Sequence, residues 1–436
     1  MLKRISAVAL ISAFLCFILT GCSEAVETDD YYVYPVVMGL DKGVHNKLKL
    51  TIEYPTYKKG GGGGQMGGGG EKKGGGEESG GYSLQGANIH TIETPTIIEG
   101  LDIFSMAISR RISLIHIKLL VISEELAREG IGDYLAPLGR YRDTRSTMFV
   151  LVARGNAVDF IKENKANIGE SITKSIELME EQSKKTSYFP DINFHEFFRD
   201  VVSPYSAPYA AYVGVNDLKK LITKDEGGEA KLVTEYDYLP GDMPREGVAK
   251  REYVGTAVFD GDRMVGSLNP TETRYMLMLN GRFKRGVFTI EDKRSPGDGI
   301  TVDIRLEKHP SIKVRFEDGI PVYDIKLDIE ANIESIQSRV NYEKLDMIDE
   351  LNNQIKSHLE DGMKKTIEKA QKEIKSDVFG LGNKLAGQFP TIQEWEEYNW
   401  LSHFPESKIN VDIQVTTRGT GLIIESPPIF SSEGRK

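Results

Sequence analysis

Cysteine is nearly absent from this chain of 436 residues. Only Cys16 and Cys22 occur, and both stand within the first 22 residues. The rest of the chain therefore cannot build a disulfide framework, a thiolate metal cluster or a cysteine nucleophile. The two cysteines therefore bear only on the export and processing of the N-terminal segment.

Positive charge and long apolar runs are also scarce. The formal net charge is −10 and the sequence pI is about 5.4. An acidic chain is unsuited to nucleic acid, and it predicts no polybasic attachment to anionic lipid. No run of about 18 apolar residues occurs, so we expect no membrane-spanning helix.

The first residues have the pattern of an export signal. Lys3 and Arg4 precede an apolar run over residues 5–18, which is too short to span a bilayer. Cleavage before Cys22 would remove residues 1–21 and take the net charge to −12, since both early cations leave. An ordinary export signal with a chance cysteine is the alternative.

Leu19-Thr20-Gly21-Cys22 resembles the lipobox of bacterial lipoproteins. The resemblance implies cleavage between Gly21 and Cys22, an S-diacylglyceryl group on Cys22, and a further N-acyl chain such as palmitate on the new amino terminus. Two acyl chains hold a protein stably on a membrane. We therefore expect a protein on the outer face of a membrane, in contact with lipid through Cys22.

Residues 22–203 predict an N-terminal α/β domain. Strands are expected at 34–40 and 47–54, and the continuous apolar runs at 116–123 and 147–154 indicate buried strands. Thr94-Pro95 predicts a helix start, and His116 is expected in the core or at a strand end. A loop at 58–81 holds 14 of the 44 glycines and is expected to be disordered.

Residues 204–300 predict a middle domain. Asp260-Gly261 stands between two apolar stretches and indicates a β-hairpin over 254–268. Asn269-Pro270 then predicts the start of a helix over 271–278.

Residues 301–428 predict a C-terminal α+β domain in the order β-β-β-α-β. Apolar residues recur every three or four positions along a long helix at 342–376. The expected fold class is therefore α+β, with three domains and helices packed on mixed sheets.

No catalytic, metal or cofactor site is expected. The seven histidines never fall at metal-ligand spacing, and Ser171-Ile-Thr-Lys174 lacks the motifs that accompany it in serine hydrolases. Trp395 and Trp400 suit either an aromatic ligand platform or the seam between a helix and a sheet. The second interpretation is favoured, and the sequence predicts no enzyme.

Several stretches resemble the Ger(x)C lipoproteins, the C subunits of spore germinant receptors. They are HIKLLVISEELAREGI, YVGTAVFDGDRMVGSLNPTETRYMLML, SDVFGLG, FPTIQEWEEYNW and VDIQVTTRGTGL. The motif positions that the resemblance marks as structural or partner-contact candidates are Gly255, Asp260, Gly261, Gly266, Glu272, Phe379, Gly380, Pro390, Trp395 and Trp400. The acidic SEAVETDDYY after Cys22 and the glycine-rich tract depart from the family pattern.

The resemblance implies a non-catalytic subunit without a cofactor. It implies assembly with integral membrane A- and B-type subunits, a role in nutrient germination, and a place at the inner spore membrane. The alternative is a solute-binding lipoprotein of a nutrient importer, and a cell-envelope hydrolase is a third hypothesis. The sequence does not name the germinant.

Overall fold

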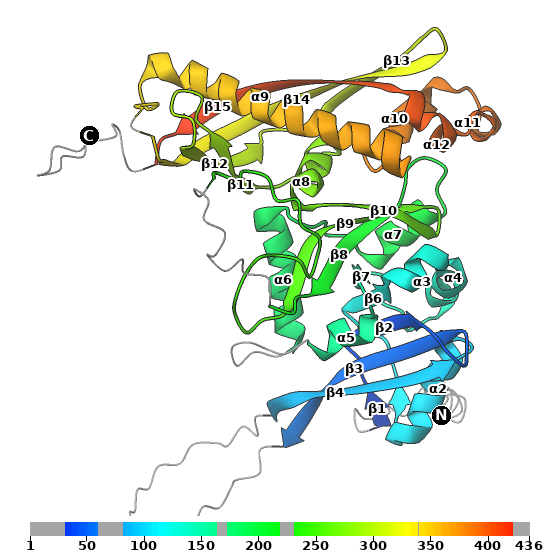
Figure 1. Cartoon of the computed structure of the whole chain (residues 1–436). Helices are drawn as coiled ribbons and strands as arrows, with labels where there is room; N and C mark the ends of the chain where they lie inside the picture. Colours follow the sequence, from blue (N-terminus) through cyan, green and yellow to red (C-terminus); the bar gives the residue numbers. More distant parts are fainter. Residues whose placement is uncertain (1–30, 60–81, 164–171, 219–230, 339, 422–436) are drawn as a thin grey trace, which may run out of the picture.

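Two large β-sheets with packed helices form the protein (Figure 1). The computed structural model describes residues 31–59, 82–163, 172–218, 231–338 and 340–421. Strands β1 (Tyr32–Val33) and β5 (Arg111–Ile112) also form a short parallel pair. The expected α+β class with mixed sheets is confirmed.

The first sheet has eight strands in the order β10-β9-β8-β7-β6-β2-β3-β4. Their bounds are β2 Val37–Lys42, β3 Leu48–Lys59, β4 Tyr82–Thr94, β6 Leu119–Ser123, β7 Phe149–Ala153, β8 Tyr209–Val215, β9 Arg251–Asp260 and β10 Arg263–Leu268. Strands β2, β6, β7 and β8 are parallel, and the others pair antiparallel. β6 and β7 are buried along their whole length, which explains their continuous apolar sequences.

Helices cover both faces of this sheet. Their bounds are α2 Ile97–Ile108, α3 Glu124–Glu129, α4 Gly132–Arg140 and α7 Phe194–Val201 on one face, and α5 Ala157–Lys162 and α6 Ile172–Thr186 on the other. The cap of α2 is Thr96, whose side chain accepts from the Glu99 amide at 3.2 Å, and the predicted start at Thr94-Pro95 was therefore early. His116 is exposed rather than in the core.

The eight-stranded sheet crosses the domain limit expected at residue 203. The predicted hairpin is confirmed as β9–β10, but β8 pairs with β7, and β9 pairs with β8. The predicted ranges 22–203 and 204–300 thus share one sheet, because β7 and β8, which lie on either side of residue 203, pair with each other. The outer limits of the three ranges stay a prediction.

The second sheet has five strands, in the order β11-β12-β14-β13 with β15 beside β14. Its strands are β11 Gly286–Glu291, β12 Gly299–Leu306, β13 Ser311–Glu317, β14 Ile320–Ile336 and β15 Lys408–Gly419. β14 and β15 are parallel, since the long helix α9 (Leu345–Lys369) crosses between them. The expected β-β-β-α-β order is present, with β11 added before it.

α9 continues into a π-helical turn, Ala370–Ile374. The short helices α10 Gly382–Leu385, α11 Ile392–Tyr398 and α12 Trp400–His403 then return the chain to β15. Helix α8 (Pro270–Leu279) lies between the hairpin β9–β10 and α9 (Figure 1). Buried apolar residues of both sheets form one continuous cluster through this helix.

Strand β3 comes directly before the glycine-rich tract in the sequence, and strand β4 comes directly after it. Their antiparallel pairing extends to Lys59 opposite Tyr82. The predicted loop at 58–81 lies outside the described residues, apart from the last two residues of β3 at 58–59.

Candidate functional site

Three of the motif residues, Gly266, Glu272 and Trp400, lie where the two sheets meet. The hairpin β9–β10, helix α8 and the segment after α9 approach one another there. We call the contact region formed by Gly266, Glu272, Arg274, Asp377 and Trp400 the junction.

Gly255 and Gly266 fit close contacts in the hairpin. Gly255 has φ +94°, its amide donates to the Tyr188 carbonyl at 2.8 Å, and a Cβ there would lie 2.6 Å from the Leu268 carbonyl oxygen. A Cβ on Gly266 would lie 2.9 Å from the Ile374 side chain at the end of the π-helical turn. A larger residue at Gly266 would therefore separate the first sheet from the segment after α9.

The tip of the hairpin makes a different contact. Gly261 has φ +56°, as the tight turn requires, and Asp260 is exposed. Asp262 accepts from the Gly132 amide at 3.0 Å through its side chain and from the Ile131 amide at 3.1 Å through its carbonyl. The tip thus fixes the start of α4, away from the junction.

Glu272 connects α8 with α9. Its side chain accepts from the Asn269 amide at 2.8 Å, and the Asn269 side chain accepts from the Glu272 amide at 2.8 Å, which forms a capping box. The same carboxylate lies 2.7 Å from Lys369 Nζ, and both side chains are mostly buried. One carboxylate therefore stabilises a helix start and an interhelical contact.

Arg274 joins the end of α6, on the first sheet, to strand β11 of the second sheet through a buried guanidinium. Its central carbon lies 4.0 Å from the ring centre of Tyr188 and 4.3 Å from that of Phe288 in β11. Its Nε donates to the Thr186 carbonyl at 3.0 Å. Burial lowers the pKa of Arg274, and the neighbouring tyrosines oppose that effect. The two aromatic faces stabilise the cation where water is excluded.

Asp377 is fully buried at the centre of the junction. Its carboxylate accepts from Trp400 Nε1 at 2.8 Å, from the Gly382 amide at 2.9 Å and from the Phe379 amide at 3.2 Å. Its carbonyl accepts from the Ala207 amide at 3.1 Å, just before β8. Burial raises the pKa of Asp377, although these donors act in the opposite direction.

The remaining motif residues surround Asp377. Ser376 Oγ donates to the Phe259 carbonyl at 2.8 Å, which ties the segment to β9. Phe379 is buried and lies 6.3 Å from Phe404 between ring centres, and Gly380 has φ +70°. Pro390 is exposed on the loop before α11 and does not reach Asp377.

Both tryptophans are buried, as the core interpretation predicts. Trp395 stacks on Tyr205 at 5.6 Å between ring centres with an interplanar angle of 11°. Tyr205 precedes β8, so this stack connects α11 with the first sheet, in addition to the contacts of Ser376 and Asp377. Trp395 Nε1 has no hydrogen-bond partner among the described residues, whereas Trp400 Nε1 binds Asp377.

Sequence reasoning missed three residues of this region: Asp377, Arg274 and Tyr205. Asp377 and Arg274 stand inside stretches that carry the family resemblance, which was the available signal. Tyr205 stands at the start of the predicted middle range, 204–300, and no local pattern marked it. Gly21 and Cys22 lie outside the described residues.

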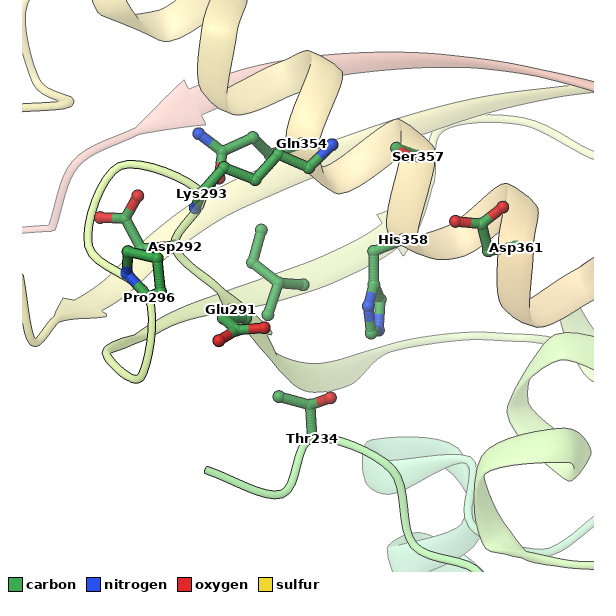
Figure 2. Close-up of a pocket in the computed structure, with 10 residues that line it drawn as sticks. Thr234, Glu291, Asp292, Lys293, Pro296, Gln354, Ser357, His358 and Asp361 are labelled. Carbon is green, nitrogen blue, oxygen red and sulfur yellow. Dashed lines mark hydrogen bonds between the residues drawn. The ribbon is translucent and has the colours of Figure 1, made fainter. Parts of the chain in front are cut away.

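A cavity of about 430 Å³ lies between α9 and the end of β11 (Figure 2). Figure 2 shows His358 projecting from α9 into the cavity, with Thr234 and Glu291 on the far side from the helix. His358 Nε2 lies 3.4 Å from Tyr275 Oη, and burial lowers the pKa of His358, which favours the neutral imidazole.

Two acidic residues of the cavity, Glu291 and Asp292, accept hydrogen bonds from neighbouring residues of the fold. At its rim, Asp292 accepts from Tyr342 Oη at 2.6 Å and from the Arg294 amide at 2.8 Å, so it orders the loop after β11. Across the described ranges, no three His, Cys, Asp or Glu side chains are grouped to hold a metal ion. Nor does any helix in those ranges have the length and apolar character to cross a membrane.

Comparison with known proteins identifies the family. Residues 30–215 match the spore germination protein N-terminal domain, and residues 254–421 match the spore germination B3/GerAC-like C-terminal domain. The Bacillus subtilis spore germination protein YndF is 25% identical over 97% of this chain and 98% of its own length. Spore germination protein KC of the same organism is 23% identical over 77% of this chain and 79% of its own length.

Among solved structures, a crystal structure of the GerBC protein aligns with 87% of this chain and 96% of its own chain. The sequence identity is 18% and the TM-score is 0.47. The two family matches together extend over both sheets and the junction between them. This chain belongs to the GerAC-like family of spore germination proteins.

Proposed function

We propose that this protein is a non-catalytic, membrane-anchored subunit of a nutrient germinant receptor. It assembles with the integral membrane A- and B-type subunits and is required for germination. The observation that carries the proposal is the junction. Its motif residues Gly266, Glu272 and Trp400 make close contacts between the elements of the two sheets. They do not surround a reactive group, which suits a subunit that presents surfaces to partners.

The anchor is the second part of the proposal. Residues 1–21 act as a signal peptide, and Cys22 carries the lipid on the outer face of the membrane, which in spores is the inner spore membrane. Attachment to a membrane confines the subunit near its partners and raises its effective concentration, so modest interfaces suffice. The short apolar run over residues 5–18, followed directly by Leu19-Thr20-Gly21-Cys22, supports this arrangement.

The junction explains how a non-catalytic subunit would act. A buried carboxylate, a buried cation between two rings and a stacked tryptophan fix the orientation of one sheet against the other. Surfaces on both sheets are then held in one geometry for the membrane subunits. Loosening the junction would weaken receptor assembly without removing any single contact to a partner.

The solute-binding alternative receives less support from the topology. Such lipoproteins have two doubly wound lobes joined by hinges, whereas here a mixed eight-stranded sheet and a mostly antiparallel sheet share one core. Titration calorimetry of the unlipidated chain with single amino acids, sugars and nucleosides tests it. Micromolar binding of one nutrient would favour that alternative.

Deletion of the gene tests the proposal. Spores without it should lose refractility and ion release in response to one class of nutrient, while a non-nutrient trigger still works. Wild-type complementation should restore the response, and Cys22→Ala should restore little of it. Normal responses to every nutrient in a strain whose other receptors are also deleted would contradict the proposal.

A further inference from the structure

Exposed arginines gather on one end of this acidic protein. Residues 109–118 contain three lysines and arginines and no acidic residue, and residues 139–147 contain three arginines and one aspartate. Arg110, Arg111, Arg142 and Arg145 are all exposed. We call these four arginines the basic face.

Hydrogen bonds and strand pairing bring the two segments together. Arg111 lies opposite Tyr32 in the β1–β5 pair, so this segment lies beside β1. Ser113 Oγ donates to Asp143 Oδ2 at 3.1 Å, which places residues 142–145 beside the same segment. The single acidic residue within the two segments is thus engaged by a neutral hydroxyl, and Arg145 Nε donates to Thr147 Oγ1 at 2.9 Å.

Apolar side chains are exposed within these segments or next to them. Tyr31 is 63% exposed, Met106 in the last turn of α2 is 76% exposed, and Ile115 is 45% exposed. Arginines beside exposed aromatic and aliphatic residues are the composition of surfaces that lie at a lipid–water interface. Arginine also suits phosphate, because its planar guanidinium donates two parallel hydrogen bonds.

The position of Cys22 puts this end of the molecule near the bilayer. Nine peptide units separate Cys22 from Tyr31, so a lipidated Cys22 holds Tyr31 within about 30 Å of the membrane surface even if the linker is fully extended. Figure 1 shows β1 and α2 at one end of the molecule, and α9 with the second sheet at the other. The anchored end and the basic face are therefore the same end.

We propose that the basic face binds the anionic phospholipid headgroups of the membrane that carries the anchor, and so orients the protein upright on it. The inference rests on the proposed attachment at Cys22. A net charge of −10 made lipid binding unexpected, because the total conceals the six lysines and arginines and the single aspartate of residues 109–118 and 139–147. The four acidic residues at positions 24, 27, 29 and 30 of the linker oppose this attraction. The acidic remainder of the surface is repelled by the same lipids, which favours one orientation over others.

Vesicle binding tests the proposal without the anchor. The chain from residue 22 with Cys22→Ser is mixed with vesicles of phosphatidylcholine alone, or with 30% phosphatidylglycerol, and separated by flotation. We expect binding only to the anionic vesicles, and weaker binding as the salt concentration rises. Replacing all four arginines of the basic face with glutamine should reduce the partition coefficient by on the order of 100-fold or more.

A matched variant distinguishes the effect of the basic face from the effect of the net charge of the protein. Lys364, Lys372, Lys384 and Lys408 are exposed residues of the C-terminal part, and their replacement by glutamine changes the net charge by the same amount. This variant should retain vesicle binding. Equal losses in both variants, or no binding of the parent chain, would overturn the proposal and leave an acidic surface of a partner protein as the target.

The result of the vesicle assay does not depend on whether Cys22 is lipidated. Mass spectrometry of Cys22 in the membrane fraction tests the anchor, and the vesicle assay omits the anchor. An unmodified Cys22 with intact vesicle binding would reject the anchor alone. A lipidated Cys22 with no vesicle binding would reject the orienting role of the basic face alone.

Discussion

The indole N–H of Trp400 donates to the buried carboxylate of Asp377 across 2.8 Å. Two backbone amides, of Gly382 and Phe379, donate to the same carboxylate. The carboxylate therefore orders the chain between the π-helical turn and α12. The backbone carbonyl of Asp377 accepts from the amide of Ala207, two residues before β8, and fixes that segment to the first sheet.

Removing the Asp377 carboxylate should destabilise the whole protein. Asp377→Ala leaves three buried donors without an acceptor, and we expect a loss of about 3 kcal/mol or more in the free energy of unfolding. Asp377→Asn keeps one acceptor oxygen and should lose less. Urea denaturation followed by circular dichroism measures both, and equal stability of Asp377→Ala and the parent would contradict the assigned role.

The two tryptophans should respond differently to the same substitution. Trp400→Phe removes the hydrogen bond to Asp377, whereas Trp395→Phe removes an N–H that has no partner among the described residues. We expect the first variant to lose about 1–2 kcal/mol more than the second. Thermal and urea unfolding of the pair measures the difference, and a larger loss for Trp395→Phe would show that packing rather than the hydrogen bond dominates.

Gly255 and Gly261 give a second matched pair. Both have positive φ, but a Cβ at Gly255 would lie 2.6 Å from the Leu268 carbonyl oxygen, while no atom lies within 4 Å of one at Gly261. Gly261→Ala should cost about 1–2 kcal/mol through its backbone conformation alone. Gly255→Ala adds the steric clash and should cost at least twice as much. Similar unfolding midpoints for the two variants would argue against the close contact at Gly255.

Arg274 should not tolerate lysine. The ammonium of lysine cannot stack flat between Tyr188 and Phe288, and it is more strongly hydrated than a guanidinium, so burial costs more. We expect Arg274→Lys to lose about 2 kcal/mol of stability. Arg263→Lys, at an exposed position of β10, is the control and should change stability by less than about 0.5 kcal/mol.

His358 should make stability depend on pH. Burial lowers its pKa in the folded protein below the ordinary value of 6.5, so the unfolded chain takes up the proton first as pH falls. The free energy of unfolding should therefore decrease as pH is lowered through 6.5, by at most about 1.4 kcal/mol per pH unit, until the folded pKa is reached. Urea titrations between pH 5 and 8 measure the slope.

His358→Gln should remove this component of the slope. Asn353→Gln, at an exposed position of the same helix, serves as the control and should leave the slope unchanged because neither side chain carries a titratable group. A pH profile that is identical in the parent and His358→Gln chains would show that the imidazole does not carry the effect.

Local patterns predicted much of the fold. α9 followed from apolar residues spaced three or four apart, of which Leu351, Ile355, Leu359 and Met363 are fully buried. The β9–β10 hairpin followed from Asp260-Gly261, because few residue pairs adopt that turn. These signals are carried by neighbouring residues, so one sequence suffices to recognise them.

Long-range pairing could not be predicted in the same way. β8 joins β7 across some sixty residues that include α5, α6 and α7, and nothing local in YAAYVGV specifies that neighbour. The segment with α10, α11 and α12 has weak helical signals of its own. Its conformation depends on Asp377 and on contacts with the first sheet, which appear only in three dimensions.

The base of the β3–β4 hairpin has a practical consequence. Backbone pairing holds Lys59 opposite Tyr82, so the two ends of any intervening chain are fixed beside each other by the sheet itself. The entropic cost of a longer connection grows only with the logarithm of its length. This position is therefore a ready insertion point for an epitope tag or a fluorescent reporter, through which the protein could be followed in living spores while both sheets remain intact.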